Sequence, residues 1–284
     1  YKLFRQDIMV SSLYRNFFLA QRVMQSLNCT PQSFPPLPDA ANHHLWTVWD
    51  RALELFLLQV NQRRTAPCAN SSFFFEEQLQ AFDVWLQSDG IEGTTAEQLP
   101  ILLQVLLSQQ LREKALHLLC RFLDKGAWAC DQALAVGLFP YVVKLLGSAT
   151  GMDYADSLVF CWMKILVVDK KKTFVQNLIR ENHHLFFLTI LKHAVSNHSH
   201  ESLTNKYAFY ILTTLFEDNN PVKNTLIHAQ LIDVIRFYMT VQNAQIREWA
   251  ILCLSKLWDN SVTIKSKYYL DVLDDLTAAL SDPE

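Results

Sequence analysis

Residues 115–124 read ALHLLCRFLD, an apolar stretch that ends in an acid, and this pattern returns three more times along the chain. The later copies are residues 158–169 (LVFCWMKILVVD), 207–218 (YAFYILTTLFED) and 249–260 (WAILCLSKLWDN). The aspartates that close the four copies, Asp124, Asp169, Asp218 and Asp259, lie 45, 49 and 41 residues apart. Each copy has the apolar spacing of a helix with one buried face.

A second motif recurs between these copies, so that each unit holds further helices. Residues 136–146 (VGLFPYVVKLL) are followed by related stretches at 182–191 and 230–239. A period of about 40 to 47 residues with two or three helices per unit is the signature of armadillo and HEAT repeats. One such unit cannot bury its own apolar face, so it stacks on its neighbour. The phrase GLFPYVVKLL resembles the start of an armadillo repeat, in which Gly137 permits a sharp corner and Pro140 begins the next helix. We therefore expect an all-α protein with an armadillo/HEAT-type α-solenoid.

Composition excludes several other classes. The 284 residues include six glycines, none beyond Gly151, where ordinary usage of about 7% would give about 20. Gly-rich phosphate loops in the C-terminal half are thereby excluded, and an all-β fold is disfavoured. The net charge of −3 argues against a nucleic-acid-binding protein, which would carry a clearly basic surface. No uncharged apolar run reaches the length of about 18 residues that a membrane span needs, so we expect no membrane insertion.

The N-terminal third is predicted to be helical and interrupted. We expect helices over residues 1–27, 43–62 and 75–87, and polar loops or turns at 63–72 and 88–95. Residues 28–39 contain four prolines and cannot form a regular helix. The spacing of Trp46, Trp49, Leu53 and Phe56 predicts a buried stripe on the second helix. We expect a helical leader and linker over residues 1–97, packed on about four armadillo repeats over 98–284. Because the chain begins without Met, we expect it to be a segment of a longer protein.

The search for catalytic or metal-binding chemistry gives no motif. No G-x-S-x-G elbow occurs, and the six cysteines form no C-x-x-C pair, which fits core residues in a reducing compartment. Five histidines between 183 and 200 (His183, His184, His193, His198 and His200) match no zinc spacing. We therefore predict no catalytic residues, no metal, no cofactor and no enzymatic activity. Residues 170–172 (KKK) predict a solvated corner or, as an alternative, a patch for an acidic partner or lipid headgroups.

Peptide binding is a second functional hypothesis. Armadillo units can hold an extended peptide with polar side chains on their third helix, where Gln132, Asn177 and Asn224 stand in this chain. A generic peptide-binding module, such as a transport-receptor-like adaptor, therefore remains the alternative to a scaffold.

Several phrases together resemble the Raptor family. They are LFRQDIMVSSLYRNFFLAQRVMQSLNCTP (residues 3–31), HHLWTVWDRALE, EQLQAFDVWL, the repeat region from EQLPILLQVLLSQ to GLFPYVVKLL, LVFCWMKILVVD and IREWAILCLSKLW. The resemblance implies a right-handed armadillo solenoid that joins a caspase-like domain to a WD40 propeller. It also implies a non-catalytic scaffold subunit of TOR complex 1 that binds the TOR kinase and Rag GTPases. Its expected location is the cytoplasm, with recruitment to the lysosomal or vacuolar surface.

The resemblance and the repeat register suggest which residues contact partners. In the family, substrates with a TOR-signalling motif bind near the start of this segment, where Arg5 and Arg15 are the polar candidates. Inter-repeat corners are expected to face Rag GTPases, and the register places Asn182, His183, Lys206 and Arg247 at such corners. Trp162, in the middle of an apolar helix, is predicted to be a buried contact between repeats.

Overall fold

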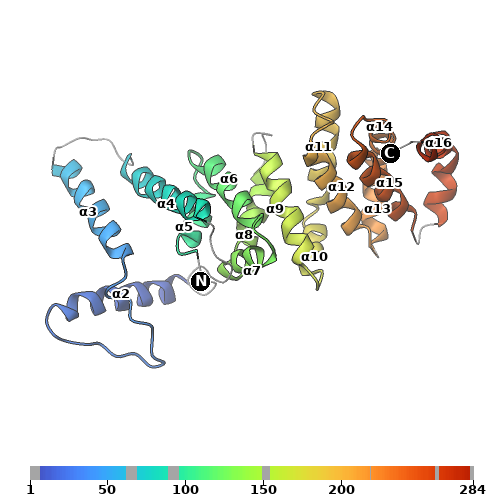
Figure 1. Ribbon diagram of the computed structural model, residues 1–284. Helices are drawn as coiled ribbons and strands as arrows, with labels where there is room; N and C mark the ends of the chain where they lie inside the picture. Colours follow the sequence, from blue (N-terminus) through green and yellow to red (C-terminus); the bar gives the residue numbers. More distant parts are fainter. Residues whose placement is uncertain are drawn as a thin grey trace. The chain divides into compact units, whose positions relative to one another are not determined.

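A computed structural model describes residues 7–61, 69–88, 96–148, 154–217, 219–259 and 262–281, and Figure 1 labels its helices. Within these ranges the regular structure is helical and no strand occurs, which confirms the all-α prediction. The chain divides into two compact units. Unit 1 comprises Tyr1–Ala115 with Ala133–Leu138, and unit 2 comprises Leu116–Gln132 with Phe139–Glu284.

Unit 1 contains the interrupted N-terminal helices. They are α2 (Ile8–Gln25), α3 (Leu45–Asn61), α4 (Ala69–Gln87) and α5 (Leu99–Val105). The Asp7 side chain caps α2 by accepting a hydrogen bond from the amide of Val10 at 3.0 Å. Residues 28–39 form no helix, as their prolines predict. Helices α4 and α5 supply large buried side chains to this unit, among them Leu79, Phe82 and Leu103.

Two expectations for unit 1 need correction. The predicted stripe on α3 is not buried, because Trp49, Leu53 and Phe56 are 53%, 43% and 52% exposed and Trp46 is only half-buried. The spacing could not show whether another element covers these side chains. In addition, α4 begins at Ala69, so residues 69–72 belong to a helix and not to the predicted loop. Residues 62–68 and 89–95, where the rest of the predicted loops fall, lie outside the described residues.

The repeat region follows as a regular series of short helices. They are α6 (Arg112–Leu123), α7 (Ala127–Val136), α8 (Phe139–Ser148), α9 (Ala155–Val168), α10 (Thr173–Arg180), α11 (His184–Ser196), α12 (Leu203–Leu215), α13 (Asn220–His228), α14 (Leu231–Tyr238), α15 (Ala244–Trp258) and α16 (Val262–Leu280). The four quoted copies lie in α6, α9, α12 and α15, which confirms the predicted repeat.

The copies in unit 2 contact one another in sequence order. Helix α12 packs against α9 on one side and α15 on the other (Figure 1). Edge-on aromatic pairs join them, because Phe160 lies 5.8 Å from Tyr207 and Tyr210 lies 5.3 Å from Trp249, measured between ring centroids. Trp162 is fully buried in α9 and meets Phe139 edge-on at 5.7 Å. Its predicted burial is confirmed.

A sharp corner precedes the last helix of each of three repeats. Gly137, Asn182 and Gln230 have φ angles of +103°, +56° and +64°, and each lies within two residues of the helix that follows it. Left-handed backbone is most accessible to glycine, and asparagine tolerates it better than most residues. The corner is therefore kept with little glycine, which explains how a chain with six glycines can turn so often.

Candidate functional site

The predicted substrate-contacting residues belong to the start of unit 1. Arg15 lies exposed on α2, and Arg5 lies outside the described residues. A mainly apolar pocket of about 340 Å³ opens between α2 and the proline-rich segment, and Arg15 is not among the residues that line it. Its lining residues are Leu13, Tyr14, Phe17, Ser33, Phe34, Pro35 and Leu37. Phe34 is fully exposed beside it, so the pocket has an unfilled apolar edge.

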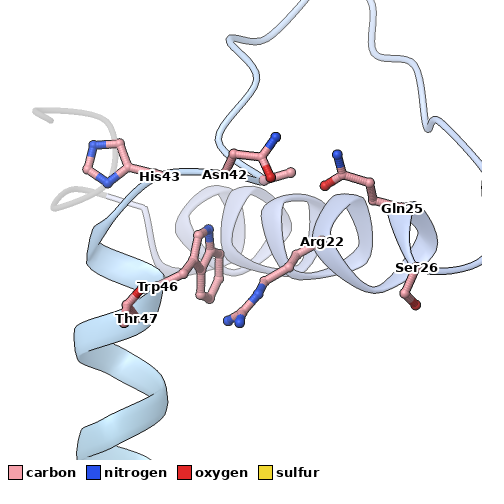
Figure 2. A pocket seen from close by; sticks show the side chains of 8 residues that line it. Arg22, Gln25, Ser26, Asn42, His43, Trp46 and Thr47 are labelled. Atoms are coloured by element: carbon pink, nitrogen blue, oxygen red, sulfur yellow. The ribbon is translucent and has the colours of Figure 1, made fainter.

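A second, polar pocket of about 490 Å³ lies between the end of α2 and the start of α3 (Figure 2). The Arg22 guanidinium lies 4.7 Å from the Trp46 ring centroid and donates to both carboxylate oxygens of Asp50, at 2.9 Å for one of them. The indole N–H of Trp46 donates to the carbonyl of Ala40 at 2.7 Å. The hydrogen bond from Arg22 lowers the pKa of Asp50 and raises the pKa of Arg22. The pair holds α2 against α3, and the charge of Arg22 is already balanced.

Large apolar side chains are exposed on the two helices that frame this pocket. On α2 they include Ile8, Met9, Leu13, Leu19 and Val23, and on α3 they include Trp49, Leu53, Phe56, Leu57 and Leu58. Exposed apolar side chains gathered on neighbouring helices are a feature of protein–protein contact sites.

In unit 2, polar side chains join successive repeats. We call the following pairs the inter-repeat ladder: Lys164–Asp124, Lys192–Gln230, Lys206–Gln245, Glu201–Asn243, Lys223–Asp259 and Arg236–Asp275. The partners are 36 to 42 residues apart, which is close to one repeat period. The bond lengths range from 2.6 to 3.1 Å. Sequence reasoning missed this ladder, and opposite charges at the repeat spacing are a signal for only two of its pairs, Lys164–Asp124 and Arg236–Asp275.

Of the predicted partner-binding residues, Lys206 belongs to this ladder, whereas Arg247 binds backbone within its own repeat. Lys206 on α12 is half-buried and donates to the Gln245 side chain on α15 at 3.0 Å. Arg247, two residues further along α15, donates to the backbone carbonyls of Val241 and Gln242 at 2.9 and 2.6 Å. The Arg247 guanidinium thus fastens the segment that leads into α15, so a charge reversal there would disturb the fold as well as any interface.

The other two predicted residues lie at a different corner. Asn182 is exposed at the turn between α10 and α11, where its positive φ is needed. His183 follows it, with Nε2 3.0 Å from a carboxylate oxygen of Glu181. Lys206 and Arg247 are brought onto adjacent helices, α12 and α15, whereas Asn182 and His183 occupy the α10–α11 corner.

The histidines between residues 183 and 200 have unlike surroundings. His184 is buried, and its ring nitrogens have no hydrogen-bond partner among the described residues. The His193 ring contacts the Asn197 amide group, and His200 lies edge-on to Phe237 at 5.4 Å. A different group, His43, His44 and Glu97, brings its ligand atoms within 4.8 Å of one another at the surface of unit 1. In that group His44 Nε2 lies 2.7 Å from a Glu97 carboxylate oxygen.

The amides and the lysine run take ordinary structural places. Asn177 donates to the carbonyl of Thr173 on its own helix at 3.1 Å, whereas Asn224 is exposed and Gln132 is half-buried. Within residues 170–172 the Lys172 ammonium pairs with Glu217 at 2.6 Å, and this hydrogen bond lowers the pKa of Glu217. Its two lysine neighbours are exposed, as a solvated corner requires.

The described helices are short or too polar for a membrane span. Taken singly, none of them combines the length and apolar character needed to cross a membrane, and α7 with α8 meets that test only as a broken pair.

Comparison with known proteins gives a consistent result. No family model matches the chain. The protein raptor homolog of Dictyostelium discoideum is 42% identical over 261 residues, which cover 91% of this chain and 17% of that protein. The target of rapamycin complex 1 subunit mip1 of Schizosaccharomyces pombe is 38% identical over 267 residues, which cover 91% of this chain and 20% of that protein.

The same relationship holds for the fold. The crystal structure of Chaetomium thermophilum Raptor matches 98% of this chain with a TM-score of 0.84 at 36% identity, over 26% of its own length. The chain spans a fifth or less of the length of the curated relatives named above. Since identity and helical architecture agree along nearly all of its residues, the chain belongs to the Raptor family, in which it corresponds to a helical-repeat segment.

Proposed function

We propose that this chain is a non-catalytic scaffold segment of a TOR complex 1 subunit and that it binds the TOR kinase. The observation that carries the proposal is the 38% identity, along 91% of the chain, to a Schizosaccharomyces pombe protein that is a TOR complex 1 subunit. The repeat architecture supports it, because successive helices that contact their neighbours offer long exposed surfaces for partners.

The surroundings of two buried cysteines, Cys130 and Cys253, do not suit nucleophilic catalysis. Burial raises the pKa of Cys130 to about 11 and that of Cys253 to about 12, so both thiols are protonated and weakly nucleophilic at neutral pH. Neither sits in an open cleft beside an oriented histidine, which is what nucleophilic catalysis requires.

We further propose that Rag GTPases and substrates with a TOR-signalling motif bind this segment at the lysosomal or vacuolar surface. Substrates would use Arg15 and the apolar pocket on the same helix, since a guanidinium attracts acidic groups and the pocket can receive apolar side chains. Rag GTPases would use the repeat corners, including Asn182 and the exposed part of Lys206, because transient interfaces are about as polar as ordinary surface.

Retention of the TOR kinase on the immobilised 284-residue chain tests the scaffold proposal. We expect TOR kinase that has been freed of its own Raptor subunit to be retained. A chain that shows the full helical signal in circular dichroism and retains no kinase would contradict the proposal.

Lys206→Glu tests the Rag surface, with Lys192→Glu as its matched control. Each lysine donates to a glutamine of the next repeat, Lys206 at 3.0 Å and Lys192 at 3.1 Å, so both variants lose the same kind of bond. We expect Lys206→Glu alone to weaken Rag capture in a pulldown, since like charges repel across an interface. Equal Rag capture by the two variants would mean that the Rag surface lies on another part of the segment. Arg247 is unsuitable for this test because of its two backbone bonds.

A further inference from the structure

Two cysteines from successive repeats face each other in unit 2. Cys120 lies on α6 and Cys161 on α9, 41 residues later, and their sulfur atoms are 3.7 Å apart. Cys120 also donates a hydrogen bond to the carbonyl of Ser157 at 3.4 Å. The two sulfurs are thus in contact across a joint between repeats, without being bonded to each other.

Access from solvent differs sharply between the two thiols. Cys161 is 0% exposed, whereas Cys120 is partly exposed and lines an open groove of about 310 Å³. The other lining residues are Arg121, Asp124, Asp156, Ser157, Phe160, Thr204 and Tyr207. Cys120 is therefore the thiol that lines the groove, whereas the buried Cys161 contacts its sulfur at 3.7 Å.

The electrostatics of the pair favour the same order of reaction. A hydrogen bond from the Cys161 thiol lowers the pKa of Cys120, and the same bond together with burial raises the pKa of Cys161 well above its usual value. The thiolate is the nucleophile in thiol chemistry, so Cys120 reacts first.

We propose that Cys120 and Cys161 form a thiol–disulfide exchange site whose ligand is a low-molecular-weight disulfide, with Cys120 as the attacking thiol and Cys161 as the resolving thiol. The Cys120 thiolate attacks one sulfur of the small disulfide, which forms a mixed disulfide and releases one small thiolate. The Cys161 thiol then gives its proton to the released thiolate, and its sulfur attacks the sulfur of Cys120. A second small thiolate leaves and takes up from solvent the proton that Cys120 released when it became a thiolate. The protein loses two electrons, and the small disulfide gains them as it becomes two thiols.

The groove suits a small zwitterionic disulfide such as oxidised glutathione. Arg121 contributes a positive charge for carboxylates and Asp156 a negative charge for ammonium groups, whereas the Asp124 carboxylate at the groove already binds Lys164. Phe160 and Tyr207, whose rings meet edge-on at 5.8 Å, give the groove an aromatic wall. The product would be a covalent bond between α6 and α9, beside the ladder pair Lys164–Asp124.

The experiment treats the folded 284-residue chain with oxidised glutathione, blocks the remaining thiols and maps the cysteines by mass spectrometry after trypsin digestion. Cys120 falls on peptide 115–121, Cys130 on 126–144 and Cys161 on 145–164, so the sites are separated by the digest itself. We expect glutathione to appear transiently on 115–121, followed by a disulfide between 115–121 and 145–164. Peptide 126–144 should keep its blocked thiol throughout.

Variants separate the two roles. Cys161→Ser should stop at the glutathione adduct on Cys120, because no resolving thiol remains, and Cys120→Ser should lose both the adduct and the disulfide. Cys253→Ser, which removes a buried thiol on α15, should behave as the unchanged chain. If Cys161→Ser fails to fold, the time course of the unchanged chain still decides. The proposal is overturned if the unchanged, folded chain yields no disulfide between 115–121 and 145–164, or if Cys120→Ser acquires glutathione on 145–164.

Discussion

At single positions, backbone conformation separates glycines that are required from glycines that are not. Gly126 joins α6 to α7 with φ of +134°, whereas Gly147 lies inside α8 with nothing within 4 Å of an added Cβ atom. An added methyl group at Gly126 would make an ordinary contact with Trp128 at 3.5 Å, so backbone strain is what opposes it. The two positions therefore isolate conformation from packing.

We predict opposite effects of the same substitution at these glycines. Gly126→Ala should lower the free energy of unfolding by at least about 1 kcal/mol, because side chains strain a positive-φ backbone. Gly147→Ala should raise it by up to about 1 kcal/mol, because alanine loses less entropy on entering a helix. Urea denaturation of both variants measures the difference. Changes of the same sign in the free energy of unfolding would contradict the positive-φ corner at Gly126.

His184 makes stability depend on pH. Burial, followed by the neighbouring His183, lowers the pKa of His184 in the folded state below its usual 6.5. As pH falls through 6.5, the unfolded chain takes up a proton at His184 before the folded chain does, so the folded state loses stability on acidification. The contribution of neutral His184 to the free energy of unfolding is fully present above the pKa that His184 has in the unfolded chain. Below that pKa it falls by at most about 1.4 kcal/mol per pH unit.

His184→Phe should remove this component. The variant keeps a ring of similar size in the buried position and cannot be protonated. We expect the difference in unfolding free energy between variant and parent to grow between pH 7 and pH 5.5, in favour of the variant. Chemical denaturation at several pH values measures it. A difference that is constant with pH would show that His184 titrates alike in both states.

At the scale of helices, the acids that close the repeat copies have different tasks. The Asp169 carboxylate accepts hydrogen bonds from the amides of Thr173 and Phe174 at 3.0 and 2.7 Å and so caps α10. The Asp124 carboxylate is exposed and binds Lys164 of the next repeat at 2.7 Å. Asp218 lies outside the described residues, and Asp259 uses its backbone carbonyl to accept from the buried Lys223 at 2.6 Å.

The two carboxylates with side-chain bonds form a matched pair for mutation. Asp169→Ala should cost about 1 to 2 kcal/mol in the free energy of unfolding, because the first amides of α10 lose their acceptor. Asp124→Ala should cost less than about 1 kcal/mol, since an exposed salt bridge is screened by water. Asp169→Asn should recover part of the loss. If Asp124→Ala lowers the free energy of unfolding as much as Asp169→Ala does, the assignment of different roles to the two carboxylates is wrong.

The helices were largely predictable from sequence because apolar spacing and helix-breaking residues are local signals. The repeat copies, the proline-rich break and the Gly137 corner are all confirmed. Burial was less predictable, as the exposed Trp49 and Phe56 show, because it depends on which distant segment covers a face. The ladder and the contact between Cys120 and Cys161 were missed for the same reason. Partner-binding residues stay predictions, although the bonds of Arg247 already argue against its use as a simple surface charge.

At the scale of the whole chain, unit 2 is stabilised by contacts between successive repeats. Helix α9 touches α8 and α12, and α12 touches α15. In such a stack, each repeat is stabilised by the repeat before it and the repeat after it. The division into a leader over residues 1–97 and repeats over 98–284 stays a prediction.

Trp162 offers a test of how far a local loss spreads along this stack. Its side chain is fully buried in α9 against Phe139 of α8, so Trp162→Ala should leave a cavity and cost about 3 to 5 kcal/mol. Trp49→Ala, at a position that is 53% exposed, should cost less than about 1 kcal/mol. Because neighbours carry the stability, hydrogen exchange in Trp162→Ala should accelerate most in α8, α9 and α12, and less in α15. Exchange that accelerates equally in all of these helices would mean that unit 2 unfolds as one cooperative block, and that coupling between repeats exceeds the stability of any single repeat.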